Sequence, residues 1–352
     1  MKRYKEIILF QNGSIGDFLM AVFLAEQLHT SGCTSRITIL VPRTSQFLRT
    51  FIGAYPFIRV VEVSRSKPIS VLALIQFLRP KTLVVLQPTP GRVPRHVKLV
   101  AWLLTRLPGS ALLGFEDSDP LVKKLYTQTL VYDTNVPFLT TLHSIAMALG
   151  VEQGMALTPS IKMVPDTNIL AHLDLEGKPY VFIHPRGSSE KRSFEADAAL
   201  EFLNALLVQF PDLTFVISGS PAEREWVTTL IMQSVAPERC VAACGMNGTQ
   251  LAALISNAQL FIGVDTGITH LACFLKVPVL AIAHKGTANW LPFYHPGAQV
   301  IYRLQEDKEV HNDRAYLNAH LAGRLKPFGN VPVRECIHAA TEMIRAMNVY
   351  KI

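Results

Sequence analysis

Residues 261–282, FIGVDTGITHLACFLKVPVLAI, contain two apolar runs separated by a polar interruption and a short helical stretch. The first run stops at Asp265-Thr266-Gly267, and the second begins after Pro278. Neither run approaches the roughly 18 apolar residues that a membrane-spanning helix needs. The pattern instead predicts a buried strand, a short helix and a second buried strand, which together form a βαβ unit.

The same alternation of strand and helix runs through both halves of the chain. In the first half, apolar strand patterns begin at EIILF and recur at RITILVP, IRVVEVS and TLVVLQP, and the second half restarts at KPYVFIHP. Alternating strands and helices are typical of α/β folds with doubly wound parallel sheets. We therefore expect two Rossmann-like domains, residues 1–165 and 166–330, and a C-terminal helix in residues 331–352 that packs back across them.

Composition limits the partners and the compartment. A net charge of +7 favours acidic partners such as nucleotides, phosphorylated glycans or anionic lipid. Aromatic residues are not interleaved with the basic ones, so we expect no nucleic-acid binding. The five cysteines are irregularly spaced, which predicts buried thiols and no metal site. The N-terminus does not resemble a signal peptide, so the expected location is cytoplasmic.

Two loops in the second half predict an anion site. Asp265, Thr266 and Gly267 stand where a strand ends and a helix begins, and free backbone N–H groups there attract anions. His270 follows in the first helical turn. The second loop, HPRGSSEKRS, offers polar and cationic side chains for a diphosphate, namely Ser188, Ser189, Lys191 and Arg192. Simple helix capping and a solvated basic turn are the alternatives.

Other nucleotide motifs are missing from the sequence. It contains no GxxxxGK[ST] phosphate-binding loop, and NGSIGD is not the GxGxxG fingerprint of dinucleotide binding. Hydride transfer with NAD is therefore disfavoured. The stretch GSIGD places Asp17 at the start of the first helix, where a carboxylate can act as a general base or serve as an ordinary N-terminal acid.

Taken in order, these segments resemble glycosyltransferase family 9, the ADP-heptose:lipopolysaccharide heptosyltransferases. The resemblance rests on ILFQNGSIGDFLMAVFLAEQL, LLGF, IHPRGSSEKRS, SGSPAERE and GMNGTQLAALISNAQLFIGVDTGITHLACFLKVPVL. It implies a GT-B fold, with two domains facing across a cleft. It also implies an inverting, metal-independent enzyme that needs no cofactor and moves heptose from an ADP-sugar to a lipopolysaccharide core or other surface glycan.

The resemblance also implies roles for individual residues. Asp17 would be the catalytic base, and Lys191 would neutralise the donor phosphate. Residues 265–267 would contact the sugar and diphosphate, with His270 beside them. Glu223 would bind the ribose, and Met246 would face the adenine unless it is a core methionine. The residues expected on the acceptor side are Gly13, Gly16, Arg92, Arg95 and Lys98. In one departure, Ser193 stands where the family commonly has an aromatic residue.

RHVKLVAWLLTRL, residues 95–107, reads as one helix. At 100° per residue, one face collects Arg95, Lys98, Trp102, Thr105 and Arg106. We interpret this face as a contact for an acidic, lipid-linked acceptor at the inner membrane surface, which would make the protein peripheral there. A solvated helix with one exposed aromatic residue is the alternative.

Three other functions stay open from sequence alone. Asp117 and Asp119 match the Asp-x-Asp signature of metal-dependent glycosyltransferases, although such a triplet arises easily in a polar turn. A sugar-nucleotide epimerase or hydrolase would share the nucleotide-binding half and need no acceptor. A non-catalytic nucleotide-sugar binder would not need Asp17.

Overall fold

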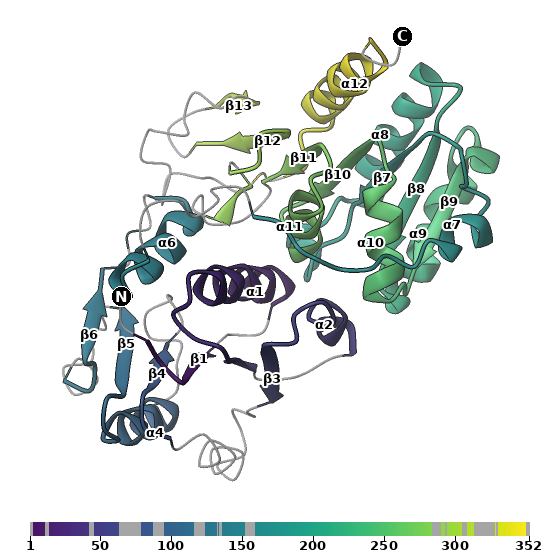
Figure 1. Cartoon of the computed structure of the whole chain (residues 1–352). Coiled ribbons are helices and arrows are strands. Elements are labelled where there is room, and N and C mark those ends of the chain that lie inside the picture. The colour runs from purple at the N-terminus through teal and green to yellow at the C-terminus, as the bar shows by residue number, and fades with distance from the viewer. Residues whose placement is uncertain are drawn as a thin grey trace. The chain divides into compact units, whose positions relative to one another are not determined.

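The computed structural model describes most of the chain and divides it into two compact units (Figure 1). One unit comprises Met1–Asp133, Phe138–Leu157 and Ile161–Met163, and the other comprises Thr134–Pro137, Thr158–Ser160 and Val164–Ile352. The described residues are 3–10, 14–41, 46–62, 79–86, 95–115, 124–131, 133, 136–151, 159–283, 290–292, 294–304, 308–312, 328 and 330–349.

The first unit is built on a parallel sheet. Its described strands are β1 (Glu6–Phe10), β2 (Ile37–Val41), β3 (Ile58–Glu62), β4 (Thr82–Val85), β5 (Ala111–Phe115) and β6 (Gln128–Leu130). They lie in the order β3-β2-β1-β4-β5-β6, and every pair is parallel. The described helices are α1 (Ile15–Thr30), α2 (Gln46–Thr50), α4 (Arg95–Thr105) and α6 (Phe138–Ala148). Gly32 has a φ of 76° just after α1, the conformation that commonly ends a helix.

The second unit repeats this plan. Its described strands are β7 (Tyr180–His184), β8 (Thr214–Gly219), β9 (Cys240–Cys244), β10 (Leu260–Val264), β11 (Val279–Ile282), β12 (Ala298–Arg303) and β13 (Val310–His311). The order is β13-β12-β11-β10-β7-β8-β9, and only the β12–β13 pair among these is antiparallel. The helices described here are α7 (Asn168–His172), α8 (Ala196–Gln209), α9 (Arg224–Gln233), α10 (Gly248–Ser256), α11 (Gly267–Phe274) and α12 (Val333–Val349).

The core of the second unit explains its continuous apolar strands. Parallel strands buried on both faces need apolar side chains pointing both ways. On one face, side chains such as Ile183, Ile217 and Ile262 pack with buried residues of α8, α9 and α12. On the other face, Tyr180 Oη donates a 2.6 Å hydrogen bond to the carbonyl of Leu254 in α10. The C-terminal helix α12 packs on α8, β10 and β11, all within this unit (Figure 1).

Helix α4 forms where the sequence predicts it, but its exposed face differs from the prediction. Lys98 is only 4% exposed, on the same side as the buried Ala101 and Leu104, while Leu99 and Leu103 are half exposed. The prediction that Lys98 belongs to an exposed cationic face is therefore wrong. Lys98 lies only about 60° around the helix from Ala101, and the stripe packed against β4 and β5 is wide enough to include it.

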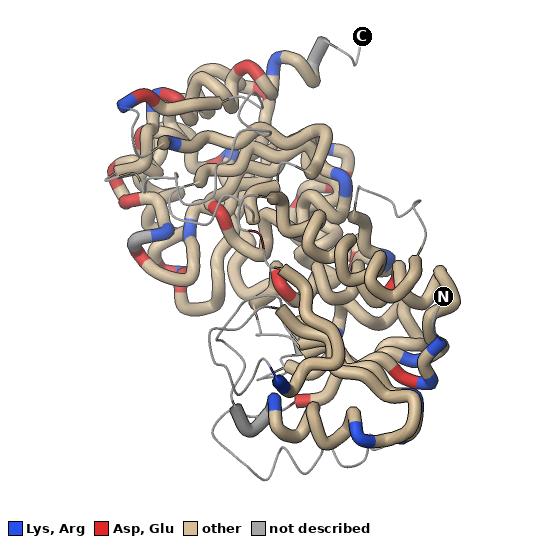
Figure 2. The backbone as a smooth tube through the Cα atoms, turned by 90° about the vertical axis from the view of Figure 1, so that its left-hand side faces the viewer, with Lys and Arg blue, Asp and Glu red and all other residues tan. Residues whose placement is uncertain are grey.

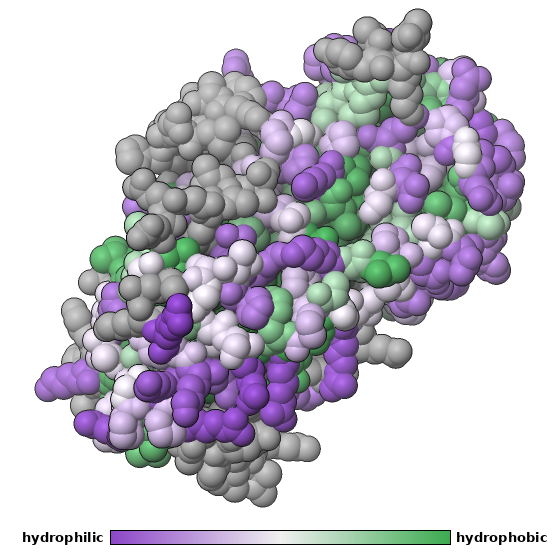
Figure 3. Space-filling model, in the orientation of Figure 1, coloured by the Kyte–Doolittle hydropathy of each residue, from purple (hydrophilic) through white to green (hydrophobic). Residues whose placement is uncertain are grey.

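The surface is mixed in charge and hydropathy. Basic and acidic positions are interspersed along the backbone of each unit (Figure 2). On the face shown in Figure 3, hydrophilic residues cover much of the surface, and hydrophobic residues show between them in scattered patches. Among the described residues, no helix is both long and apolar enough to cross a membrane.

Candidate functional site

The strand order of the second unit points to one end of its sheet. The chain runs from β7 outward through β8 and β9, then returns to place β10 on the other side of β7. Ligands of such sheets bind at the carboxyl ends of the strands beside this reversal. The loops after β7 and β10 start there, and they are the two loops that the sequence predicts as an anion site.

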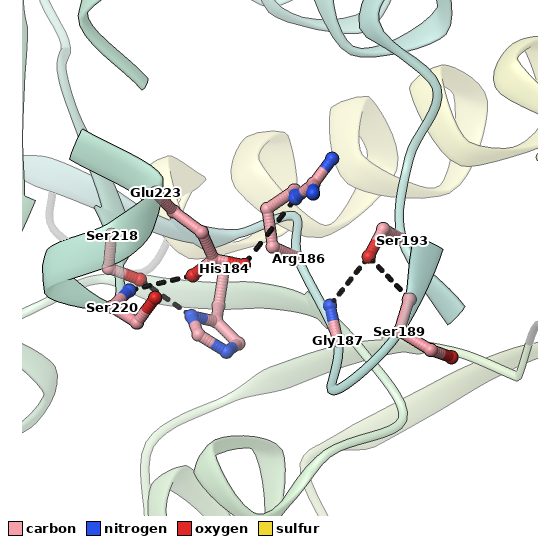
Figure 4. Close-up of polar contacts among 8 residues, drawn as sticks. All are labelled: His184, Arg186, Gly187, Ser189, Ser193, Ser218, Ser220 and Glu223. Carbon is pink, nitrogen blue, oxygen red and sulfur yellow. Dashed lines mark hydrogen bonds and ion pairs between the residues drawn. The ribbon is translucent and has the colours of Figure 1, made fainter. Parts of the chain in front are cut away.

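The loop after β7 is held in shape by Ser193. Gly187 N–H donates to Ser193 Oγ at 2.9 Å, and Ser193 Oγ donates to the carbonyl of Ser189 at 2.9 Å (Figure 4). Ser193 is 1% exposed, and Phe194 beside it is buried in the core. A Cβ on Gly187 would lie 2.4 Å from the Arg192 carbonyl oxygen, so this tight loop requires glycine. Ser193, the residue that departs from the family pattern, therefore stabilises the loop through hydrogen bonds within it.

A cation of this loop reaches the end of β10. Arg192, in the 3₁₀ turn Glu190–Arg192, donates from Nη2 to the Asp265 carbonyl at 2.7 Å and lies 3.4 Å from Asp265 Oδ2. Burial raises the pKa of Asp265 to about 6, although Arg192 lowers it. Arg192 Nε is buried and makes no hydrogen bond within the part of the chain that the structure describes. The structure therefore brings together the two loops that the sequence predicts.

The start of α11 receives no capping hydrogen bond from the side chain of its N-cap residue. Thr266 occupies the N-cap position, but its side chain makes no capping hydrogen bond. Its hydroxyl lies 3.4 Å from the Thr269 hydroxyl, and Gly267 is the first helical residue. The first N–H groups of a helix have no partner within the helix, and together with the helix dipole they favour an anion. Thr266 therefore takes the N-cap position without the side-chain hydrogen bond that a capping role alone would provide.

His270 lies in the first turn of α11 among aromatic rings. It is 4% exposed, and its Nδ1 lies 2.8 Å from Tyr294 Oη. The Trp290 ring meets it edge-on, with centroids 6.3 Å apart. Burial lowers the pKa of His270 to about 4, so the ring is neutral at pH 7.

Glu223, in the 3₁₀ turn Pro221–Glu223 after β8, is held as a carboxylate. Its Oε2 accepts a 2.7 Å hydrogen bond from Ser220 N–H, and its Oε1 lies 3.4 Å from Arg186 Nε (Figure 4). Burial opposes ionisation, but the bonds from Ser220 and Arg186 leave the pKa of Glu223 below its ordinary value. The Arg186 guanidinium also lies over the Trp226 ring, 4.9 Å from its centroid.

His184 ends β7 beside these groups. Its Nδ1 lies 2.9 Å from Ser218 Oγ (Figure 4). Ser218 Oγ in turn donates to the carbonyl of Ile183 at 3.2 Å. A hydroxyl has one proton, so Ser218 accepts from Nδ1–H and leaves Nε2 as an acceptor. Burial lowers the pKa of His184 to about 4, although Glu223 raises it.

The other predicted residues are placed as follows. Ser188 and Ser189 are exposed, Met246 is half-buried in the loop after β9, and Lys191 lies in the 3₁₀ turn with Arg192. Gly16 is buried in α1, and Arg95 is the first residue of α4. Gly13, Arg92, Asp117 and Asp119 lie outside the described residues.

In the first unit, Asp17 lies in the first turn of α1. Ser14 Oγ donates to Asp17 Oδ2 at 2.6 Å and accepts from Asp17 N–H at 3.2 Å, so Ser14 caps the helix and orients the carboxylate. Asp17 is partly exposed, and it lines a narrow apolar crevice with Phe10 and Leu142. This geometry suits a general base, and it equally suits a first-turn acid that helps to cap α1.

Three features of the site were not predicted from the sequence: Tyr294 against His270, Arg186 against Glu223, and Ser218 against His184. His184 and Ser218 stand in the last residues of strands, and that position could have marked them. Among the described residues, no group of three or more His, Cys, Asp or Glu side chains is arranged to hold a metal ion.

Comparison with known proteins gives one family and a shared fold. The sequence model of glycosyltransferase family 9 (heptosyltransferase) matches residues 94–320, more than half of the chain. A glycosyltransferase family 9 structure from Veillonella parvula is 18% identical, with 85% of this chain and 86% of that one covered and a TM-score of 0.67. No curated protein sequence matches.

Two further structures come from E. coli. ADP-heptose lps heptosyltransferase II is 14% identical, with 100% of this chain and 99% of that one covered and a TM-score of 0.67. Heptosyltransferase WaaC with ADP is 15% identical, with 84% of this chain and 92% of that one covered and a TM-score of 0.62. At these identities the matches show the fold, and the predicted α/β architecture of two Rossmann-like parallel-sheet domains is confirmed.

Proposed function

Because the chain belongs to glycosyltransferase family 9, the heptosyltransferases, and has their GT-B fold, we propose a specific reaction for it. The enzyme transfers heptose, or a closely related sugar, from ADP-heptose to a lipopolysaccharide-core acceptor. The transfer inverts the anomeric centre and uses no metal or other cofactor. Structures of similar proteins bound to ADP and to an ADP-heptose analogue support this choice of donor.

The observation that carries the proposal is the junction of the loops after β7 and β10. There the Arg192 guanidinium, the uncapped start of α11 and the Gly187 turn surround one end of the sheet. Charge develops on the diphosphate as the sugar leaves it, and preorganised donors stabilise such charge. Charge-assisted hydrogen bonds contribute about 1.5–3 kcal/mol each, so Lys191, Arg192 and the α11 backbone can replace a metal ion.

The attacking hydroxyl of the acceptor must lose its proton as the new bond forms. We assign this step to Asp17, whose carboxylate is oriented by Ser14. Glu223 would receive the ribose hydroxyl groups, and Met246 would lie against the adenine. On the acceptor side, our candidate residues are Gly13, Gly16, Arg92 and Arg95. We further propose that the enzyme acts in the cytoplasm, at the inner membrane surface.

The test is a transfer assay with lipopolysaccharide that lacks the heptose as acceptor. ADP-heptose, ADP-glucose, UDP-glucose and GDP-mannose are compared as donors, each with and without EDTA. The proposal predicts transfer from ADP-heptose that EDTA does not abolish, with inverted anomeric configuration in the product. Loss of activity in EDTA with rescue by Mn²⁺ would instead support the Asp117/Asp119 hypothesis. Breakdown of the donor at full rate without acceptor would support a hydrolase.

A further inference from the structure

Tyr294 holds the buried histidine of the candidate site. Tyr294 lies between β11 and β12, and its Oη is 2.8 Å from Nδ1 of His270 in α11. The two rings are nearly parallel, at 12°. Nε2 of His270 makes no hydrogen bond to any residue in the described part of the chain. One ring nitrogen is thus fixed, and the other is left for a ligand.

Near neutral pH, the imidazole of His270 and the hydroxyl of Tyr294 each have one proton that can be donated. Burial lowers the pKa of His270 to about 4, so its imidazole is neutral and has one N–H. Burial also raises the pKa of Tyr294 well above its ordinary value, so the phenol keeps its proton. The short contact between them therefore contains a single hydrogen, given either by the phenol or by the imidazole.

The surroundings of Tyr294 decide which group donates. If the imidazole donated from Nδ1, the phenol would have to place its own proton elsewhere. Among the described residues, the other side chain that hydrogen-bonds to the phenol is the fully buried thiol of Cys273, while Asp265 acts on the phenol only through its charge. Thiol sulfur is a weak acceptor, whereas a neutral imidazole nitrogen is a good one. The phenol proton therefore goes to Nδ1, and the histidine proton stays on Nε2.

We propose that Tyr294 is a positioning residue that fixes neutral His270 with its proton on Nε2, so that His270 donates a hydrogen bond to an oxygen of the bound nucleotide-sugar. The inference rests on the proposed function, because it takes the ligand of this site to be that donor. His270 lies one helical turn from Thr266 and Gly267, where the diphosphate is expected. A histidine donor there adds to the stabilisation of the leaving group without adding a charge.

The proton position can be measured without any substrate. Nitrogen NMR of ¹⁵N-histidine-labelled protein distinguishes the two neutral tautomers, and the signal missing from a His270→Gln variant identifies His270 among the eleven histidines. We expect the Nε2–H form in the wild type and a mixture of both forms in Tyr294→Phe. A wild-type proton on Nδ1, or an unchanged tautomer in Tyr294→Phe, would overturn the inference.

Kinetics then test the consequence for transfer. Tyr294→Phe should lower kcat/KM about tenfold, the effect of losing one well-placed hydrogen bond. The matched control is Tyr180→Phe, which removes a buried phenol hydrogen bond of the same unit outside the site. We expect its kcat/KM to stay within about twofold of wild type. Equal losses in both variants would overturn the role of Tyr294. If the wild type itself transfers no sugar, the proposed function fails, and the tautomer measurement still stands.

Discussion

The contact between Arg192 and Asp265 makes the stability of the second unit depend on pH in a defined way. Arg192→Met removes the cation and keeps much of the aliphatic volume. At pH 8 the Asp265 carboxylate would then be buried without its partner. Breaking a buried ion pair costs about 3–5 kcal/mol. Because the Arg192 side chain is 34% exposed, solvent screens part of its interaction with Asp265. We therefore expect Arg192→Met to lower the free energy of unfolding by about 2–3 kcal/mol at pH 8.

At pH 5 the same variant should lose less stability than at pH 8. The pKa of Asp265 is raised to about 6 in the folded protein, above its usual value of about 3.9. Ionising this group therefore opposes folding, and stability falls as the pH rises through 6. Without Arg192 the pKa rises further, so Asp265 is protonated at pH 5 in both proteins. The remaining cost is the hydrogen bond to the Asp265 carbonyl, which the partial exposure of Arg192 limits to about 1 kcal/mol, below the range for a fully buried charge-assisted bond.

Urea unfolding followed by tryptophan fluorescence at pH 5 and pH 8 measures both values. The control is the same change in an Asp265→Asn background, where Arg192→Met should cost about 1 kcal/mol at either pH because no carboxylate remains to be ionised. An equal loss at both pH values in the wild-type background would refute the reasoning. So would a pH dependence that persists in the Asp265→Asn background.

Two further variants test the loops around this contact. Ser193→Ala removes two hydrogen bonds of the loop after β7. ADP should therefore bind about fivefold to tenfold more weakly, as measured by calorimetry. An unchanged ADP affinity would show that the loop keeps its shape without these bonds. Arg186→Gln disturbs Glu223 and should weaken ADP binding about fivefold. The affinity for an ADP analogue that lacks both ribose hydroxyl groups should change by no more than about twofold. If both nucleotides bind equally more weakly, Arg186 has no role in ribose binding.

The fold could be predicted because its signals are local. A parallel strand buried on both faces reads as a continuous apolar run, as in residues 260–264 and 279–282. The end of such a run also marks the ligand-binding edge of the sheet. The sequence therefore marks Asp265, Thr266 and Gly267, and the structure places Arg192 of the predicted second loop against Asp265.

The parts that were missed depend on distant contacts. Arg186 meets Glu223 across 37 positions, and His270 meets Tyr294 across 24, from elements whose approach no local pattern encodes. The exposure of Lys98 was predicted wrongly for a related reason. Periodicity gives the angle between side chains on a helix, but the width of the buried stripe depends on the strands beneath it.

The central claim is that Asp17 acts as the base while the second unit holds the donor. The most direct measurement compares ADP binding and heptose transfer in wild type, Asp17→Asn and the control Asp197→Asn. Asp197 is an exposed acid in the first turn of α8, so its variant should match wild type in both. Asp17→Asn should bind ADP normally and transfer heptose about 10²- to 10⁴-fold more slowly. Transfer at nearly the wild-type rate would leave Asp17 as a partner in helix capping and contradict the account.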